Sequence, residues 1–253
     1  TTTDGYFDED NNMNGTVKYS GPQNDPSIII QNIVTLTGSA SITNTFSTPV
    51  PPGNPAHICG DNFVDSRDGN EYSTVLIGTQ CWMAENLNIG TMIYGIDDQM
   101  DNSIIEKYCH GDIAGNCDTY GGLYQWNEMM QYTEMQGAQG ICPDGWHVPT
   151  DEEWKQLEGE ADSQYNYPDP EWDKSGLATL RGTDVGDNLK SATAWGWMGN
   201  GTNMYGFTGL PGGYRDTDGT FKFLDFNGNF WTSNKSGTTS WFRELYLGFD
   251  CHR

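Results

Sequence analysis

The sequence predicts an α+β fold in which two helices accompany short antiparallel strands and long loops. Three observations support this fold class. The 253 residues include 32 glycines among many Asn, Asp, Thr and Ser residues, which adopt positive φ angles or bond locally to the backbone and so favour turns. Six cysteines provide candidate disulfides. Apolar residues recur at helical spacing in two places, whereas short aromatic stretches separated by turns indicate strands.

The first 55 residues are expected to form a β-prone extension, followed by a domain over residues 56–253. The extension contains neither cysteine nor tryptophan and ends in STPVPPG (residues 47–53), which cannot continue a helix or a central strand. Within it, residues 27–37 (SIIIQNIVTLT) and 40–46 (ASITNTF) are β-branched and partly alternating, as in a pair of strands. Two strands alone are marginally stable, so we expect them to pack against something.

The extension also contains half of a calcium-binding pattern. Asp10, Asn12 and Asn14 precede a glycine within DEDNNMNG (residues 8–15), and such alternating oxygen ligands begin a calcium loop. The twelfth position of that loop is normally acidic, but here it is Gly21. Because calcium needs about six oxygen ligands, a solvated acidic turn is the favoured interpretation and a calcium site is the alternative. The sequence therefore predicts no cofactor, with calcium as the one candidate.

A strand and a first helix are expected next. Residues 71–77 (EYSTVLI) have the pattern of a strand, which leads through Gly78 to the stretch CWMAENLN (residues 81–88). In residues 121–132 (GGLYQWNEMMQY), three apolar side chains fall at i, i+3 and i+7. This spacing predicts an amphipathic helix over residues 121–132.

A second helix is signalled by its capping residues. Thr150 and Glu153 have the spacing of a capping box. Trp154, Leu157 and Ala161 then share one face of the helix.

From residue 206 onward, short aromatic stretches alternate with turn residues. The pattern predicts four short antiparallel strands. They span residues 206–213, 220–226, 229–232 and 240–247.

The charge balance limits the classes of partner. Lys and Arg total 12 against 35 Asp and Glu, for a net charge of -23, so nucleic acid and anionic lipid surfaces would be repelled. No apolar run approaches the roughly 20 residues of a membrane helix. The sequence has no initiator Met and no leader pattern. We therefore expect a mature exported protein that is secreted, periplasmic or displayed on a cell surface.

The cysteine spacing favours disulfides. No two cysteines form a C-x-x-C pair, so the spacing suits neither a zinc knuckle nor a thioredoxin-type site. An oxidising compartment would allow bridges that each stabilise by about 2–4 kcal/mol. Six buried thiols are the alternative. The cysteines are Cys59, Cys81, Cys109, Cys117, Cys142 and Cys251.

Several ordered motifs give the chain a family resemblance. They are residues 59–61 (CGD), 78–88 (GTQCWMAENLN), 120–126 (YGGLYQW), 142–154 (CPDGWHVPTDEEW), 209–215 (GLPGGYR) and 241–243 (WFR). In this order they resemble the Fibrobacter succinogenes major paralogous domain, over about residues 59–243. The WHVPTDEEW stretch is also similar to the signature of formylglycine-generating and sulfatase-modifying proteins. The family occurs in secreted and cell-surface bacterial proteins.

The resemblance implies a C-type-lectin-like fold with two helices, small twisted antiparallel sheets and a long loop region. It also implies that Cys59 pairs with Cys81 and Cys109 with Cys117. Cys142 would then pair with a cysteine near the end of the domain, which here is Cys251.

No residue pattern indicates catalysis. The formylglycine-generating relatives oxidise a cysteine with a cysteine pair and copper, and no such pair exists here outside the expected disulfides. The four histidines, His57, His110, His147 and His252, lack the i, i+4 spacing of a helical metal site. The sugar-binding motifs of calcium-dependent lectins are absent as well. Function must therefore be argued from a binding surface rather than from the fold.

The candidate binding residues are aromatic. Trp172, Trp195, Trp197 and Tyr205 lie in a Gly/Asn/Asp-rich region, residues 169–209, where the fold would place its long loop. Rigid aromatic rings on loops are common contact groups, but tryptophan is also usually buried, so a core role is the alternative.

Two functions remain. The first is a secreted or cell-surface, non-catalytic adhesion module that recognises a glycan or protein through these loops. The second is a structural subunit of an extracellular assembly or homo-oligomer, in which residues 27–46 add a strand to a neighbour's sheet.

Overall fold

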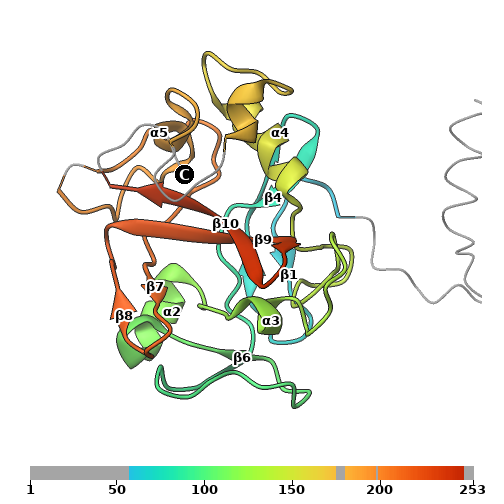
Figure 1. The fold of residues 1–253 in the computed structure, drawn as a ribbon, viewed down its shortest axis with the longest axis vertical. Coiled ribbons are helices and arrows are strands. Elements are labelled where there is room, and N and C mark those ends of the chain that lie inside the picture. The colour runs from blue at the N-terminus through green and yellow to red at the C-terminus, as the bar shows by residue number, and fades with distance from the viewer. Residues whose placement is uncertain (1–56, 175–179, 198, 248–253) are drawn as a thin grey trace, which may run out of the picture. The chain divides into compact units, whose positions relative to one another are not determined.

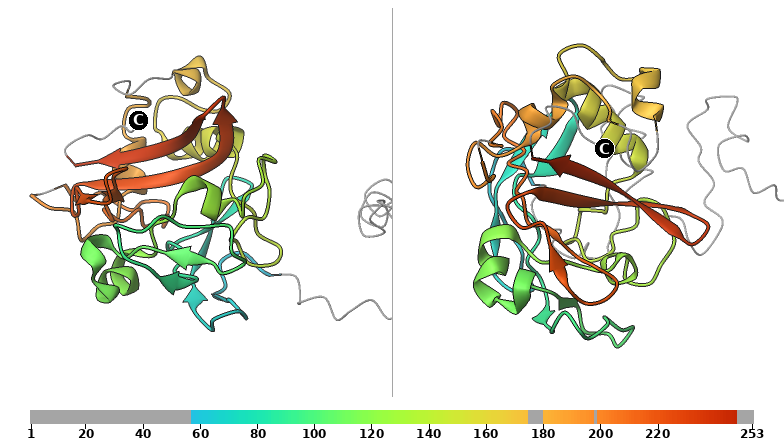
Figure 2. Two further views of the ribbon diagram at one scale, coloured as in Figure 1. Left: turned by 60° about the horizontal axis from the view of Figure 1, so that its bottom comes forward. Right: turned by 60° about the vertical axis from the view of Figure 1, so that its left-hand side comes forward.

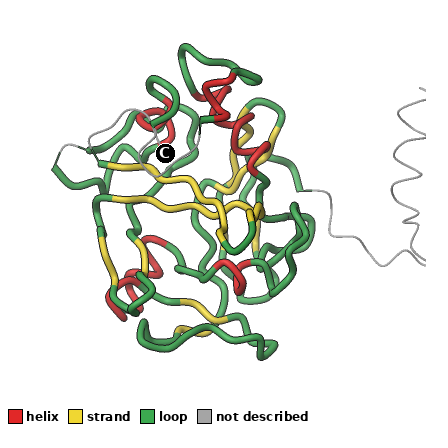
Figure 3. Tube along the Cα trace, viewed as in Figure 1, coloured by secondary structure: helices red, strands yellow, loops and turns green. Residues whose placement is uncertain are grey.

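The computed structural model describes residues 57–174, 180–197 and 199–247, all of which belong to the unit Asn54–Arg253 (Figure 1). The expected strands over residues 27–46, the calcium candidates Asp10, Asn12 and Asn14, and Cys251 lie outside the described residues. In the described part, loops and turns connect short helices and strands (Figure 3), as the glycine-rich composition predicts.

Within the described ranges, the strands form two-stranded sheets, four antiparallel and one parallel. The antiparallel pairs are β1 (Phe63–Val64) with β2 (Glu71–Tyr72), β3 (Thr74–Ile77) with β4 (Gln80–Met83), β7 (Tyr214–Arg215) with β8 (Phe221–Lys222), and β9 (Asn227–Ser236) with β10 (Thr239–Tyr246). The parallel pair is β5 (Thr91–Met92) with β6 (Glu106–Lys107). The predicted short antiparallel sheets are thus confirmed.

The described residues contain four α-helices, two more than expected. They are α2 (Ala114–Tyr120), α3 (Trp126–Met129), α4 (Asp151–Ala161) and α5 (Val185–Leu189), with two 3-10 turns, η1 (His110–Asp112) and η2 (Pro170–Asp173). Helices α2 and α5 are short and contain few apolar residues. Neither therefore has the repeated apolar spacing by which a helix is predicted from sequence. None of the described helices has the length and apolar character to cross a membrane.

Helix α3 is shorter than the predicted helix over residues 121–132. Gly121 has a φ of 82°, which ends α2 rather than beginning a new helix. At the other end, Gln131 and Tyr132 have φ angles of 50° and 59°, and this left-handed conformation cannot continue an α-helix. Only the central turn of the predicted helix forms.

Helix α4 begins as its sequence predicts. The Thr150 hydroxyl accepts from the Glu153 N–H at 3.2 Å, and the Glu153 carboxylate accepts from the Thr150 N–H at 2.8 Å. This capping box satisfies N–H groups at the start of the helix that lack a partner within it. Trp154, Leu157 and Ala161 are all buried on one face.

The C-terminal strands differ in part from the prediction. Residues 206–213 form isolated bridges instead of a strand, and only Phe221 and Lys222 pair within residues 220–226. The paired region ends there because Phe223 and Asp225 adopt φ angles of 59° and 67°. The remaining two strands are the long ribbon β9–β10, which runs across the unit (Figures 1 and 2).

Strand β9 lies between two apolar clusters. Phe230 packs against a cluster around Trp154, Leu157 and Leu245, and the next residue, Trp231, packs against a second cluster around Trp126 and Met130. Consecutive strand side chains point to opposite faces, so one strand contributes to both clusters. Hydrogen bonds from the Trp126 and Trp231 indoles to backbone carbonyls, each of 2.8 Å, fix this arrangement.

The described residues contain two disulfides. Cys59 is bonded to Cys81 and Cys109 to Cys117, the pairs that the family resemblance implies. Cys142 is buried in the second cluster and forms no disulfide with a described residue. Its proposed partner Cys251 lies outside the described residues. Burial raises the pKa of the Cys142 thiol to about 12, so it is uncharged at neutral pH.

Candidate functional site

The structure separates the four predicted binding residues. Trp172 is 1% exposed and Trp195 is 4% exposed, and both belong to the same apolar cluster. The Trp195 indole donates to the Gly209 carbonyl at 3.0 Å, which satisfies its N–H inside the protein. The expectation that Trp172 and Trp195 contact a ligand is therefore corrected: their rings are core. Tyr205 is half-buried against this cluster.

Trp197 is the exception, because 88% of its surface is exposed. Its φ is 49°, a left-handed conformation that is rare for a bulky side chain. The turn that carries it is well anchored. The Trp195 N–H donates to the Asn200 side chain at 3.0 Å, and the Gly199 N–H donates to the Gly196 carbonyl at 2.9 Å. A large apolar ring is thus exposed to solvent between flanking residues that are hydrogen-bonded within the protein.

A second turn with exposed aromatic residues lies beside the first. The Gly196 N–H donates to the Asp225 carbonyl at 2.9 Å, which joins the Trp197 turn to residues 223–226. Phe223 and Phe226 in this second turn are both exposed. The Asp225 carboxylate accepts from the Tyr120 hydroxyl at 2.9 Å. We call Trp197, Phe223 and Phe226 the Trp197 surface.

Sequence reasoning missed Phe223 and Phe226 because it assigned them to a strand. The positive φ angles of Phe223 and Asp225 end the strand. Neither residue is a glycine, so the sequence gives no clear signal of this turn. The Trp197 surface presents apolar rings next to backbone groups already bonded within the protein, so it is suited to contact a partner rather than to transfer protons.

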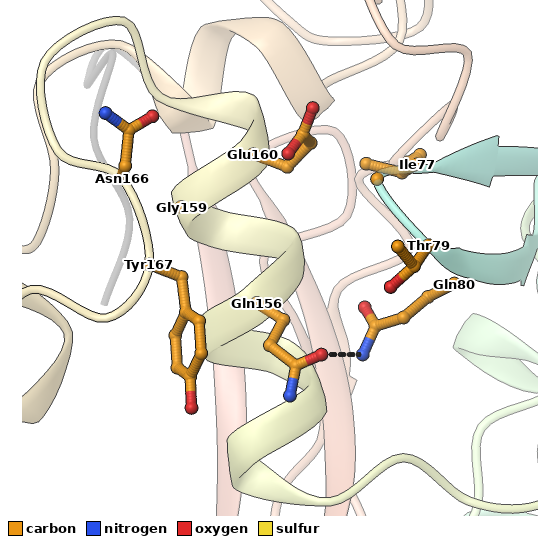
Figure 4. Close-up of a pocket in the computed structure, with 9 residues that line it drawn as sticks. Ile77, Thr79, Gln80, Gln156, Gly159, Glu160, Asn166 and Tyr167 are labelled. Atoms are coloured by element: carbon orange, nitrogen blue, oxygen red, sulfur yellow. Dashed lines mark hydrogen bonds between the residues drawn. The ribbon is translucent and has the colours of Figure 1, made fainter.

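A groove crosses the exposed face of α4 (Figure 4). It has a volume of about 280 Å³ and is lined by residues from the β3–β4 turn, from α4 and from the segment that follows α4. Asn166 and Tyr167 lie on one side of the helix, and Thr79 and Gln80 lie on the other. We call it the α4 groove. Its residues are far apart in sequence, and no motif marks them.

The described histidines take part in structural contacts. His57 lies 3.0 Å from the Thr74 hydroxyl, and His147 lies 2.8 Å from the Glu153 carboxylate of the capping box. Burial lowers the pKa of His110, although a contact with the Lys222 carbonyl opposes this shift. No group of three His, Cys, Asp or Glu side chains able to hold a metal occurs among residues that the structure describes.

Comparison with known proteins identifies the chain by family alone. The Fibrobacter succinogenes major domain matches residues 75–248, which covers β3 from its second residue, the described strands after it and the four described helices. No curated protein and no solved structure gives a significant match. The match extends over more than half of the sequence. The chain therefore belongs to the Fibrobacter succinogenes major domain family.

Proposed function

We propose that this protein is a non-catalytic binding module, secreted or displayed on a bacterial cell surface, that recognises a glycan or a protein through the Trp197 surface. The observation that carries the proposal is the 88% exposure of Trp197 on a hydrogen-bonded turn. Burial of a large apolar side chain is favourable by about 1.5–3 kcal/mol or more relative to exposure. The exposed Trp197 ring gains this free energy only when a partner covers it. Tryptophan is also enriched among residues that dominate binding energy.

The reactive groups support a passive role. An uncharged thiol is a poor nucleophile, and burial keeps Cys142 in that form at neutral pH. Four other cysteines are joined in disulfides. A formylglycine-generating type of oxidation, which relies on a reactive cysteine pair, is accordingly the less favoured alternative. The same disulfides are compatible with an oxidising compartment outside the cytosol.

A binding screen tests the proposal. The full chain would be applied to a glycan array and to an array of purified extracellular proteins, with calcium and with EDTA. We expect specific binding that is lost in Trp197→Ala and retained in Trp241→Ala, which removes a different partly exposed tryptophan. Binding that depends on calcium would support the candidates Asp10, Asn12 and Asn14. The absence of specific binding on both arrays would contradict the proposal.

A second function, a structural subunit of an extracellular assembly, is favoured by the edge of β10. Among the described residues, β10 pairs only with β9, and its Trp241 and Phe242 side chains are exposed. An edge strand with apolar side chains can accept a further strand from another chain. The β-branched residues 27–46 are the proposed donor.

Light scattering of the full chain over a range of concentrations distinguishes the two functions. Assembly through a donated strand predicts a concentration-dependent oligomer that Ile33→Pro abolishes, because proline removes a backbone donor. A monomer at all concentrations would favour the binding module alone.

A further inference from the structure

The α4 groove contains an amide whose orientation is fixed by a chain of hydrogen bonds. The Trp82 indole can only donate, and it donates to Gln80 Oε1 at 3.2 Å. Gln80 Nε2 therefore faces Gln156, and it donates to Gln156 Oε1 at 3.2 Å. This leaves Gln156 Nε2 as a donor with no hydrogen-bond partner among the described residues.

An acceptor lies beside this donor. Glu160 follows Gln156 by one helical turn, so the two side chains share a face of α4. The Glu160 carboxylate lines the groove and has no hydrogen-bond partner in the described part of the chain. Gly78 packs close to it, since a Cβ at Gly78 would lie 3.4 Å from Glu160 Cγ. The groove thus offers one donor and one acceptor at neighbouring positions.

An aromatic ring forms one wall. Tyr167 is partly exposed, and its hydroxyl is bonded to the Glu152 carboxylate, which restrains the ring. The backbone at Tyr167 lies directly on α4 because Gly159 has no side chain: a Cβ there would be 2.3 Å from Tyr167 N. The floor of the groove is therefore bare helix, and its wall is a restrained ring (Figure 4).

We propose that the α4 groove binds a single neutral sugar unit, with adjacent hydroxyls bonded to Gln156 and Glu160 and the C–H face of the sugar against Tyr167. Sugar hydroxyls both donate and accept, so they complement an amide next to a carboxylate. The C–H groups of a sugar ring carry a slight positive charge that suits the negative face of an aromatic ring. This site is separate from the Trp197 surface.

Size and charge favour a sugar over other ligands. A volume of about 280 Å³ is slightly below the range of roughly 300–1,000 Å³ for drug-sized ligands, which suits one ring better than a longer chain. The other polar lining residues, Thr79, Gln80 and Asn166, are neutral. A basic peptide side chain would leave these hydroxyl and amide groups unused.

Ligand-observed NMR on the full chain tests the site. The probes are the methyl glycosides of glucose, galactose, mannose and N-acetylglucosamine, with Nα-acetyl-lysine methylamide as the cationic comparison. A ligand of this size binds with a Kd of about 1 mM, so saturation transfer is the suitable measurement. We expect at least one glycoside to bind, with EDTA having no effect because the groove has a single carboxylate.

Variants locate the binding. Gln156→Ala and Glu160→Ala are expected to raise the Kd at least tenfold, whereas Glu134→Ala, which removes an exposed glutamate outside the groove, leaves it unchanged. Far-UV circular dichroism confirms that each variant is folded. Retention of the sugar signal in Trp197→Ala separates this site from the proposed function.

Three results would overturn the assignment. The first is that no glycoside binds. The second is that a glycoside binds equally well to the Gln156 and Glu160 variants. The third is that the lysine derivative binds while the glycosides do not, which would make the groove a site for basic peptides.

Discussion

Arg243 in β10 donates a hydrogen bond from Nε to the carboxylate of Glu158 in α4, and both side chains are buried. The same carboxylate oxygen accepts from Arg181 Nη2 at 2.7 Å. Arg243 also donates to Asp151 at the start of α4. These bonds join helix α4 to the β9–β10 ribbon beside the first apolar cluster.

Removal of the shared carboxylate should therefore destabilise the domain strongly. Glu158→Ala leaves two buried guanidinium groups without their main partner, and breaking a buried pair in this way costs about 3–5 kcal/mol. Urea unfolding followed by tryptophan fluorescence measures the change. Glu134→Ala is the control, because it breaks an ion pair with Lys235 in which Glu134 is exposed, worth about 1 kcal/mol or less. Equal effects of the two variants would show that the buried pair does not hold the domain together.

The environment of Asp162 predicts how the stability of the folded domain depends on pH in the acidic range. Burial alone would raise its pKa, but backbone N–H donors from Thr183, Tyr165 and Gln164 outweigh burial and lower the pKa below its usual 3.8. A lowered pKa stabilises the folded state above pH 4, and the stabilisation is lost as the pH falls below that value.

We expect Asp162→Asn to lower the free energy of unfolding by about 1.5–3 kcal/mol at pH 7. The gap between variant and wild type should narrow toward pH 3, because the Asp162 carboxyl of the unfolded chain takes up a proton at higher pH than that of the folded protein. Urea titrations at pH 7, 5 and 3 provide the comparison. A gap that is constant over this range would mean that the charge of Asp162 contributes nothing.

Two helical glycines predict opposite effects of the same substitution. Gly159→Ala places a methyl group 2.3 Å from Tyr167 N, so the chain must shift, at a cost of about 1–3 kcal/mol, and the α4 groove should be distorted. Gly115→Ala in α2 meets nothing within 4 Å and should stabilise by up to about 1 kcal/mol, because alanine favours helix. Thermal unfolding of the two variants tests this contrast, which would fail if both moved in the same direction.

The conformation and exposure of Trp197 predict that replacing this residue with glycine stabilises the folded domain. A left-handed residue with a side chain costs about 1–2 kcal/mol relative to glycine, and the exposed ring contributes little burial in return. Trp197→Gly should therefore raise the free energy of unfolding by up to about 1 kcal/mol while removing a contact group. Denaturant unfolding checks the sign: a clear loss of stability would mean that the ring packs against the domain.

Short sequence motifs predicted the structure of their own segments well. They could not predict which side chains pack together from distant parts of the chain. The capping box of Thr150 and Glu153 fixed the start of α4, since its bonds lie within four residues. The helix around Trp126 was predicted too long because Gln131 and Tyr132, which are not glycines, adopt positive φ angles. No local sequence signal separates the three tryptophans of residues 169–209, yet two are core and one is exposed. Their burial depends on Leu157, Phe207 and Leu245, which are distant in sequence, as are the two halves of the α4 groove.

The affinity of Trp197 variants for a ligand found on the arrays tests the central claim most directly. Biolayer interferometry would compare the wild-type full chain with Trp197→Ala and Trp241→Ala. The account predicts a loss of about 30-fold or more for Trp197→Ala, as for a tryptophan at the centre of an interface, and less than a twofold change for Trp241→Ala. Equal affinity of Trp197→Ala and the wild type would contradict it.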